Sequence, residues 1–216
     1  MFRWTTFDVR PLMPAGWDST ISSAAERLHK RKVIVPPHIT SREGPDVRSL
    51  TIRGVGSNAV RAELSWLDEL YRTVFKELAQ RTTSEPVSVA QGERHTVVLN
   101  VQHCGDMRYE CHVDTNPIQG MLYVTTHPPG HGGELVVCNN AEASNVDQID
   151  QDCSTIYPIA GHLLFFDGRH NPHYIRPMLQ KGARRVAVAM NFYVPSVPEA
   201  SRPPDLDEYL YGTVID

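Results

Sequence analysis

Apolar residues recur along this chain with two different periods. In residues 57–78, leucine, valine and aromatic residues are spaced three or four positions apart with acidic residues between them, which predicts an amphipathic helix capped by Ser57 or Asn58. A second helix is predicted over residues 18–31 and a short strand over residues 48–56. The first part of the chain is therefore predicted to mix helices and strands.

After Pro86 the pattern becomes strand-like. Short runs rich in β-branched and aromatic residues are separated by Gly, Pro, Asn and Asp. These runs occupy residues 87–90, 95–103, 120–126, 132–138, 161–166, 173–178 and 184–194. Many short strands with a helix alongside predict a sandwich or a barrel. The tail from residue 195 is rich in proline and then acidic, which predicts an extended arm with one short helical turn.

Length and charge narrow the class of protein. A chain of 216 residues fits one domain, and a formal charge of −4 without a basic stripe argues against a nucleic-acid partner. The longest basic run, Lys30-Arg31-Lys32, is interpreted as a solvated helix end rather than a phosphate site. No apolar run approaches a membrane span, no secretory signal is visible, and the four cysteines lack CxxC spacing. We therefore expect a cytoplasmic protein without a membrane partner; the oligomeric state stays open.

Candidate chemistry is concentrated in a His-x-Asp triplet, His112 and Asp114, and in a histidine far downstream. The two residues alternate in a strand-like run, so their side chains are expected on one face. A third ligand must come from a later strand: His173 begins such a strand, whereas His170 precedes an Asn-Pro turn. Two imidazoles and one carboxylate can occupy one face of an octahedral Fe(II) and leave three positions open for a chelating cosubstrate and O2. The set predicts an iron oxygenase, with His170 as the competing third ligand.

Six motifs follow one another in residues 95–195: YECHVDTNP, GMLYVTT, GGELVV, GHLLFF, RHNPHYIRP and RRVAVAMNFY. This order resembles the Fe(II)/2-oxoglutarate-dependent dioxygenases, especially their prolyl-hydroxylase-like branch, and it favours His173 over His170 as the third ligand. The resemblance implies a mostly β fold with flanking α: a double-stranded β-helix, or jelly roll, with helices packed on one face.

We expect one such domain over residues 1–216. Residues 1–90 would give helical and lid support, and they carry none of the resemblance. Residues 91–195 would form the jelly-roll core with the metal site. Residues 196–216 would form a C-terminal arm.

The family implies a role for each candidate residue. His112, Asp114 and His173 would bind Fe(II), and 2-oxoglutarate would chelate the same iron. Tyr123 and an arginine would bind the distal carboxylate of 2-oxoglutarate, because a planar guanidinium pairs with a carboxylate in bidentate fashion.

Two adjacent arginines compete for that carboxylate. Arg184 follows Gly182 at the family's Gly-x-Arg spacing, whereas Arg185 shares its strand face with two alanines and Asn191. Adjacent strand residues point to opposite faces, so only one arginine can enter the barrel. A small, partly polar face suits a cosubstrate pocket, which favours Arg185.

The implied reaction is the oxidative decarboxylation of 2-oxoglutarate to succinate and CO2, driven by O2 and coupled to hydroxylation of a substrate. Desaturation and ring closure use the same ligands and stay open. Halogenating members of the family carry a small residue where this chain has Asp114, so the carboxylate argues against halogenation. Tyr109, Gln102, Asn191 and Arg176 are the candidate substrate contacts.

A compact chain without a separate recognition domain favours a small-molecule substrate, either an amino acid or an intermediate in natural-product biosynthesis. The likeness to prolyl hydroxylases keeps a peptidyl or protein prolyl substrate open. A nucleic-acid demethylase is weakened by the acidic balance. The alternative of another class is a cupin-like, non-catalytic binding protein, which the loss of any metal ligand would support. All three ligands are present in the sequence.

Overall fold

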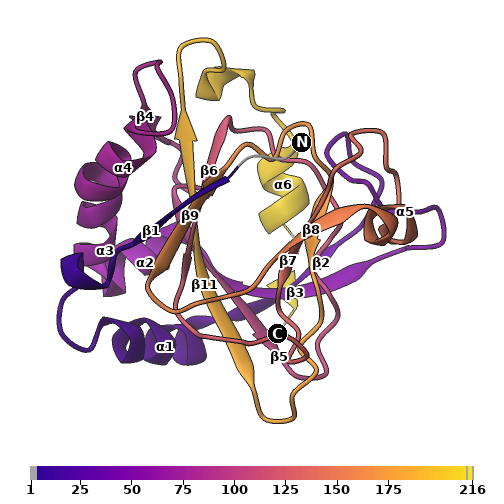
Figure 1. The fold of residues 1–216 in the computed structure, drawn as a ribbon, viewed down its shortest axis with the longest axis horizontal. Coiled ribbons are helices and arrows are strands. Elements are labelled where there is room, and N and C mark those ends of the chain that lie inside the picture. The colour runs from indigo at the N-terminus through magenta and orange to yellow at the C-terminus, as the bar shows by residue number, and fades with distance from the viewer. Residues whose placement is uncertain (1–3, 213, 216) are drawn as a thin grey trace.

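The structure is a computed structural model that describes residues 4–212 and the backbone of residues 214–215, and it is built mainly from antiparallel strands (Figure 1). The strands of the larger sheet are β1 (Trp4–Asp8), β2 (Lys30–Ile34), β3 (Leu50–Val55), β4 (Ser88–Val89), β5 (Val97–His103), β6 (Ile118–Tyr123), β9 (His162–Phe166), β11 (Arg184–Tyr193) and β12 (Val214–Ile215). The smaller sheet contains β7 (Leu135–Cys138), β8 (Cys153–Ile156) and β10 (His173–Ile175).

The larger sheet has the order β1-β9-β6-β11-β5-β3-β2-β12, with β4 paired to β11, and the smaller has the order β10-β7-β8. The helical elements are α1 (Trp17–Leu28), α2 (Ser57–Glu63), α3 (Ser65–Leu70), the π-helical turn η2 (Tyr71–Phe75), α4 (Lys76–Gln80), α5 (Val146–Gln151) and α6 (Leu206–Tyr211). Two 3-10 turns are η1 (Arg10–Leu12) and η3 (Glu199–Ser201). In the described residues no helix is long and apolar enough to span a membrane.

Strand β11 divides the interior into two cores because alternate side chains point to opposite faces of the sheet. Val186, Val188 and Met190 pack in one cluster with buried residues of α1 to α4, which lie together on the outer face of the larger sheet (Figure 1). Ala187 faces the other way, into a cluster formed by residues of both sheets. The predicted fold class, mostly β with helices on one face, is confirmed.

The predicted helix over residues 57–78 is interrupted twice. Leu64 leaves helical geometry, with φ −130° and ψ 50°, and Tyr71 begins the π-helical turn. The predicted cap is also wrong: Gly56 takes the N-cap position, and the Ser57 hydroxyl instead accepts a hydrogen bond of 3.3 Å from the backbone N–H of Val97. Ser57 thus serves the start of strand β5 rather than its own helix.

The predicted helix over residues 18–31 ends early. His29 is extended, with ψ 142°, and the next residue begins strand β2. The basic run therefore lies on a strand, where alternation buries Lys32 between the exposed Arg31 and the half-buried Val33. The interpretation of this run as a solvated helix end is wrong for Lys32.

The hydroxyl of Tyr71 fixes the helices to the sheet. It donates a hydrogen bond of 2.6 Å to the carbonyl of Asn191 and accepts one of 2.8 Å from the N–H of Ala90. Tyr71 is fully buried, so a lost hydroxyl removes one hydrogen bond from each backbone group and leaves them with their mutual hydrogen bond of 3.2 Å.

We expect Tyr71→Phe to lower the free energy of unfolding by about 1–3 kcal/mol, measured by urea denaturation. Tyr157→Phe is the matched control because Tyr157 is 38% exposed, and it should change stability by less than about 0.5 kcal/mol. Equal effects of the two substitutions would contradict the role assigned to the Tyr71 hydroxyl.

Candidate metal centre and pocket

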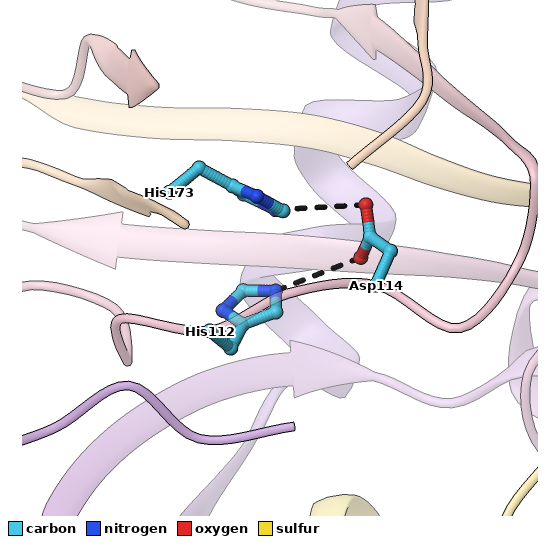
Figure 2. A group of neighbouring side chains, drawn as sticks. All are labelled: His112, Asp114 and His173. Carbon is cyan, nitrogen blue, oxygen red and sulfur yellow. Dashed lines mark ion pairs between the residues drawn. The ribbon is translucent and has the colours of Figure 1, made fainter. Parts of the chain in front are cut away.

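The side chains of His112, Asp114 and His173 converge between the two sheets, with the carboxylate between the imidazoles (Figure 2). Nε2 of His112 lies 3.7 Å from Oδ1 of Asp114, and Nε2 of His173 lies 3.5 Å from Oδ2. One potential ligand atom from each residue lies within 4.8 Å of the others, as binding to a single ion requires. Within the described residues no other His, Cys, Asp and Glu side chains gather in this way, and the exposed His170 lies outside the cluster.

Backbone hydrogen bonds bring the distant ligands together. The N–H of His112 donates to the carbonyl of His173 at 3.0 Å, and the N–H of His173 donates back at 2.9 Å. This exchange joins the segment of residues 112–114 to β10, and the N–H of Asp114 donates to the carbonyl of Gly168 at 3.0 Å. A strand was predicted here, but residues 112–114 form only an isolated bridge with β10. The segment still places the two ligands, His112 and Asp114, on one side.

Each imidazole is oriented by a carbonyl of its own chain segment. Nδ1 of His112 lies 2.8 Å from the carbonyl of Glu110, and Nδ1 of His173 lies 3.0 Å from the carbonyl of Asn171. A carbonyl only accepts hydrogen bonds, so Nδ1 carries the proton and Nε2 presents its lone pair toward Asp114. This tautomer is the one that a metal ligand needs.

Burial keeps His173 neutral. It lowers the pKa of His173 to about 4, an effect that Asp114 opposes and His112 reinforces. Oδ2 of Asp114 is buried and has no hydrogen-bond partner among the described residues. Two imidazoles whose Nε2 atoms face the carboxylate and one unsatisfied carboxylate oxygen fit a divalent cation.

Gly168 makes room for these ligands, although no motif in the sequence marks it as part of the site. A Cβ atom at this position would lie 2.1 Å from Oδ2 of Asp114 and 2.7 Å from Cε1 of His173. Contacts this short force the ligands to move. The motif DGRHNPH contains the glycine, but nothing in its spacing predicts contact with a residue so much earlier in the chain.

The two candidate arginines point in opposite directions, as their alternation on β11 predicts. Arg184 forms an ion pair with Glu26 on the helical side. Arg185 is fully buried, and its Nε and Nη1 have no hydrogen-bond partner among the described residues. Its Nη2 contacts Sδ of Met121 at 3.4 Å, and its guanidinium carbon lies 5.6 Å from the centre of the Tyr123 ring.

The hydroxyl of Tyr123 is buried near this guanidinium and likewise has no hydrogen-bond partner of normal geometry in the part of the chain described. Burial lowers the pKa of Arg185, while Tyr123 and Tyr109 raise it. An arginine stays charged even then. Unpaired donors beside a buried positive charge fit a carboxylate, which is what 2-oxoglutarate offers.

The pocket beside the metal ligands contains two of the four predicted substrate contacts. Tyr109 and Asn191 line it, although the hydroxyl of Tyr109 is already donated to the carbonyl of Arg53 at 2.7 Å. Gln102 does not line the pocket. Its side-chain amide donates hydrogen bonds to the backbone carbonyls of Met107 and Arg176. Arg176 also lies outside the lining, in a partly exposed ion pair with Asp150.

Helix α6 forms part of the wall of the same pocket, and Figure 1 shows it lying between strands of the two sheets. Leu206, Leu210 and Tyr211 contribute to the lining, and the hydroxyl of Tyr209 contacts the carboxylate of Glu110. The tail is therefore more than the extended arm predicted: its helix forms part of the pocket wall.

Comparison with known families finds a match in the central part of the chain. Residues 99–193 match the model of the 2OG-Fe(II) oxygenase superfamily. The sequence matches no curated protein.

Solved structures resemble the chain in fold. AviO1 from Streptomyces viridochromogenes Tue57 is 15% identical with a TM-score of 0.62, over 91% of this chain and 92% of that chain. HygX from Streptomyces hygroscopicus, solved with nickel, 2-oxoglutarate and hygromycin B bound, is 11% identical with a TM-score of 0.58, over 89% and 83%. A prolyl hydroxylase from Trichoplax adhaerens, in complex with a peptide of hypoxia inducible factor, is 12% identical with a TM-score of 0.58, over 93% and 87%.

The geometry predicts which variants lose metal binding. We expect His173→Ala to lower Mn(II) affinity by at least 10-fold, because it removes a ligand, and Gly168→Ala to do the same, because it displaces two. His170→Ala and Gly56→Ala are controls, since His170 is exposed and a Cβ at Gly56 meets nothing within 4 Å. Titration followed by electron paramagnetic resonance measures free Mn(II); a loss in His170→Ala with retention in His173→Ala would move the third ligand.

Proposed function

We propose that this chain, an oxidoreductase of the 2OG-Fe(II) oxygenase superfamily by its residues 99–193, hydroxylates a small metabolite such as an amino acid or a natural-product intermediate. Its cofactor and cosubstrates are Fe(II), 2-oxoglutarate and O2. The observation that carries the proposal is a set of unsatisfied groups: the metal triad in the pocket, and the unpaired guanidinium of Arg185, which contacts Met121 of the pocket lining.

In this proposal His112, Asp114 and His173 hold Fe(II). Together, bound Fe(II), 2-oxoglutarate and O2 supply an oxidant able to break a C–H bond, with succinate and CO2 as co-products. The two Nδ1–H groups, held by the carbonyls of Glu110 and Asn171, keep both imidazoles from rotating away from the metal. The carboxylate at position 114 occupies a ligand position that a halide would need, so oxygen transfer is favoured over halogenation.

Arg185 and Tyr123 are proposed to bind the distal carboxylate of 2-oxoglutarate. The guanidinium has two unpaired nitrogens, and the phenol hydroxyl can donate a further hydrogen bond to the same anion. The low dielectric around these fully buried side chains strengthens a charge-assisted pair. Met121 touches both this end and the pocket, and its flexible thioether can move as the cosubstrate enters.

The partly covered pocket favours a small substrate. Helix α6 and its contact with Glu110 close one side of the site, whereas a polypeptide needs an open groove beside the metal. Apolar lining residues, among them Met121, Leu135, Phe166 and Ile175, exclude water from the site. The fold likeness to a prolyl hydroxylase keeps a peptide substrate as the second candidate.

The function is tested with purified protein, Fe(II), 2-oxoglutarate and O2. We expect slow formation of succinate without substrate and at least 10-fold faster formation with a member of a metabolite panel, but no stimulation by proline-containing peptides. Succinate is measured by mass spectrometry. Stimulation by peptides alone would replace the small-molecule proposal with the prolyl hydroxylase, and the absence of turnover together with the absence of an Fe(II)–2-oxoglutarate absorbance band would refute both.

Arg185→Met should weaken 2-oxoglutarate binding on the order of 100-fold, because it removes the cation of a buried charge-assisted pair. It should not destabilise the protein without cosubstrate, since the guanidinium it removes is buried and incompletely paired. Arg184→Met, which breaks only the pair with Glu26, should leave 2-oxoglutarate affinity unchanged. Anaerobic titration of the absorbance band gives both dissociation constants; the opposite pattern would assign the role to Arg184.

A further inference from the structure

Lys32 is a buried cation in the wall of the substrate pocket. It lies on β2, where its neighbours Lys30 and Arg31 are exposed, but its own side chain is only 9% exposed. It lines the same pocket as the three proposed metal ligands. Lysine is among the residue types least often buried, so this position calls for an explanation.

The other cations of the pocket lining are paired with carboxylates of the chain. Arg53 donates to Asp106 at 2.9 Å, and Arg202 forms an ion pair with Asp207. Lys32 has no ion pair and no side-chain hydrogen bond with any residue in the described ranges. Its one contact of this kind is with the ring of Tyr211, whose centre lies 4.4 Å from Nζ.

The described surroundings of Lys32 make its unpaired positive charge unfavourable. Burial, reinforced by the positive charge of Arg94, lowers the pKa of Lys32 to about 8. The two lining carboxylates, Asp114 and Glu110, belong to the metal triad and to the contact with Tyr209. A buried charge is retained at a cost unless a partner compensates it, and here a ligand can supply that partner.

We propose that Lys32 binds an oxyanion of the substrate, so that the enzyme selects metabolites carrying a carboxylate or a phosphate group. This inference rests on the proposed function, since it assigns a specificity residue within the same pocket. The ring of Tyr211 holds the ammonium by a cation–π contact and places it at the pocket wall, where helix α6 closes the site. The neutral side-chain amide of Asn100, which also lines the pocket, can complete recognition of the rest of the molecule.

The test compares ligands that differ only in charge. The probes are amino acids, hydroxy acids and aromatic acids, each beside its primary amide, together with a series of monophosphate esters. Binding is measured as a rise in melting temperature and by calorimetry, with the protein loaded with Mn(II) and 2-oxoglutarate and also metal-free. Lys32→Met is compared with Lys30→Met, its exposed neighbour on the same strand.

We expect the wild-type protein to prefer acids or phosphates over neutral partners, and the better of these two anion series identifies the group bound. Lys32→Met should lose at least 10-fold of that affinity while keeping its affinity for amides and for 2-oxoglutarate, and Lys32→Arg should recover part of it. Lys30→Met should bind like the wild type.

Three outcomes would overturn the inference: equal binding of acids and amides by the wild type, unchanged acid binding by Lys32→Met, or a 10-fold loss of 2-oxoglutarate affinity in Lys32→Met. The last would place Lys32 at the cosubstrate. Failure of the proposed function is distinguishable, because it shows as the absence of the Fe(II)–2-oxoglutarate absorbance band in the wild-type protein.

Discussion

The reciprocal backbone hydrogen bonds between His112 and His173 are the constraint on which the site depends. They join an irregular segment to the end of β10 and set the two imidazole rings with their centres 4.5 Å apart. Neither hydrogen bond involves a side chain, so the chemistry of the site rests on the register between two stretches of backbone. One of these stretches is β10, in the smaller sheet. The pairing of β10 with β7 fixes the position of His173 relative to the rest of that sheet.

Strand alternation explains the division of labour around this site. On β11, the face of Val186 and Val188 packs against the helices, whereas the face of Arg185 and Ala187 borders the space between the sheets. One strand therefore supplies both part of the core that stabilises the domain and the buried cation that we propose binds 2-oxoglutarate. Apolar packing on one side allows an unpaired charge to be carried on the other, because the core offsets its cost.

The sequence predicted those features that depend on the regular alternation of side chains along a strand or on the immediate neighbours of a residue. The strand face of Arg185 and the preference for His173 over His170 both followed from neighbouring residues. The contact of Gly168 with Asp114 has no local signal, because it arises where two distant loops meet. The burial of Lys32 also has no local signal. A basic run predicts a solvated surface, and only the pairing of β2 with strands on both sides, β3 and β12, places Lys32 in the interior.

Helix α6 belongs to the C-terminal part of the chain and also forms part of the pocket wall. The helix is held in place by contacts of Tyr209 with Glu110, of Tyr211 with Lys32 and of Asp205 with His38. Because β12 follows α6 directly and pairs with β2, a displacement of this helix would also disturb that edge of the larger sheet, so the shape of the pocket and the pairing of the sheet edge are linked.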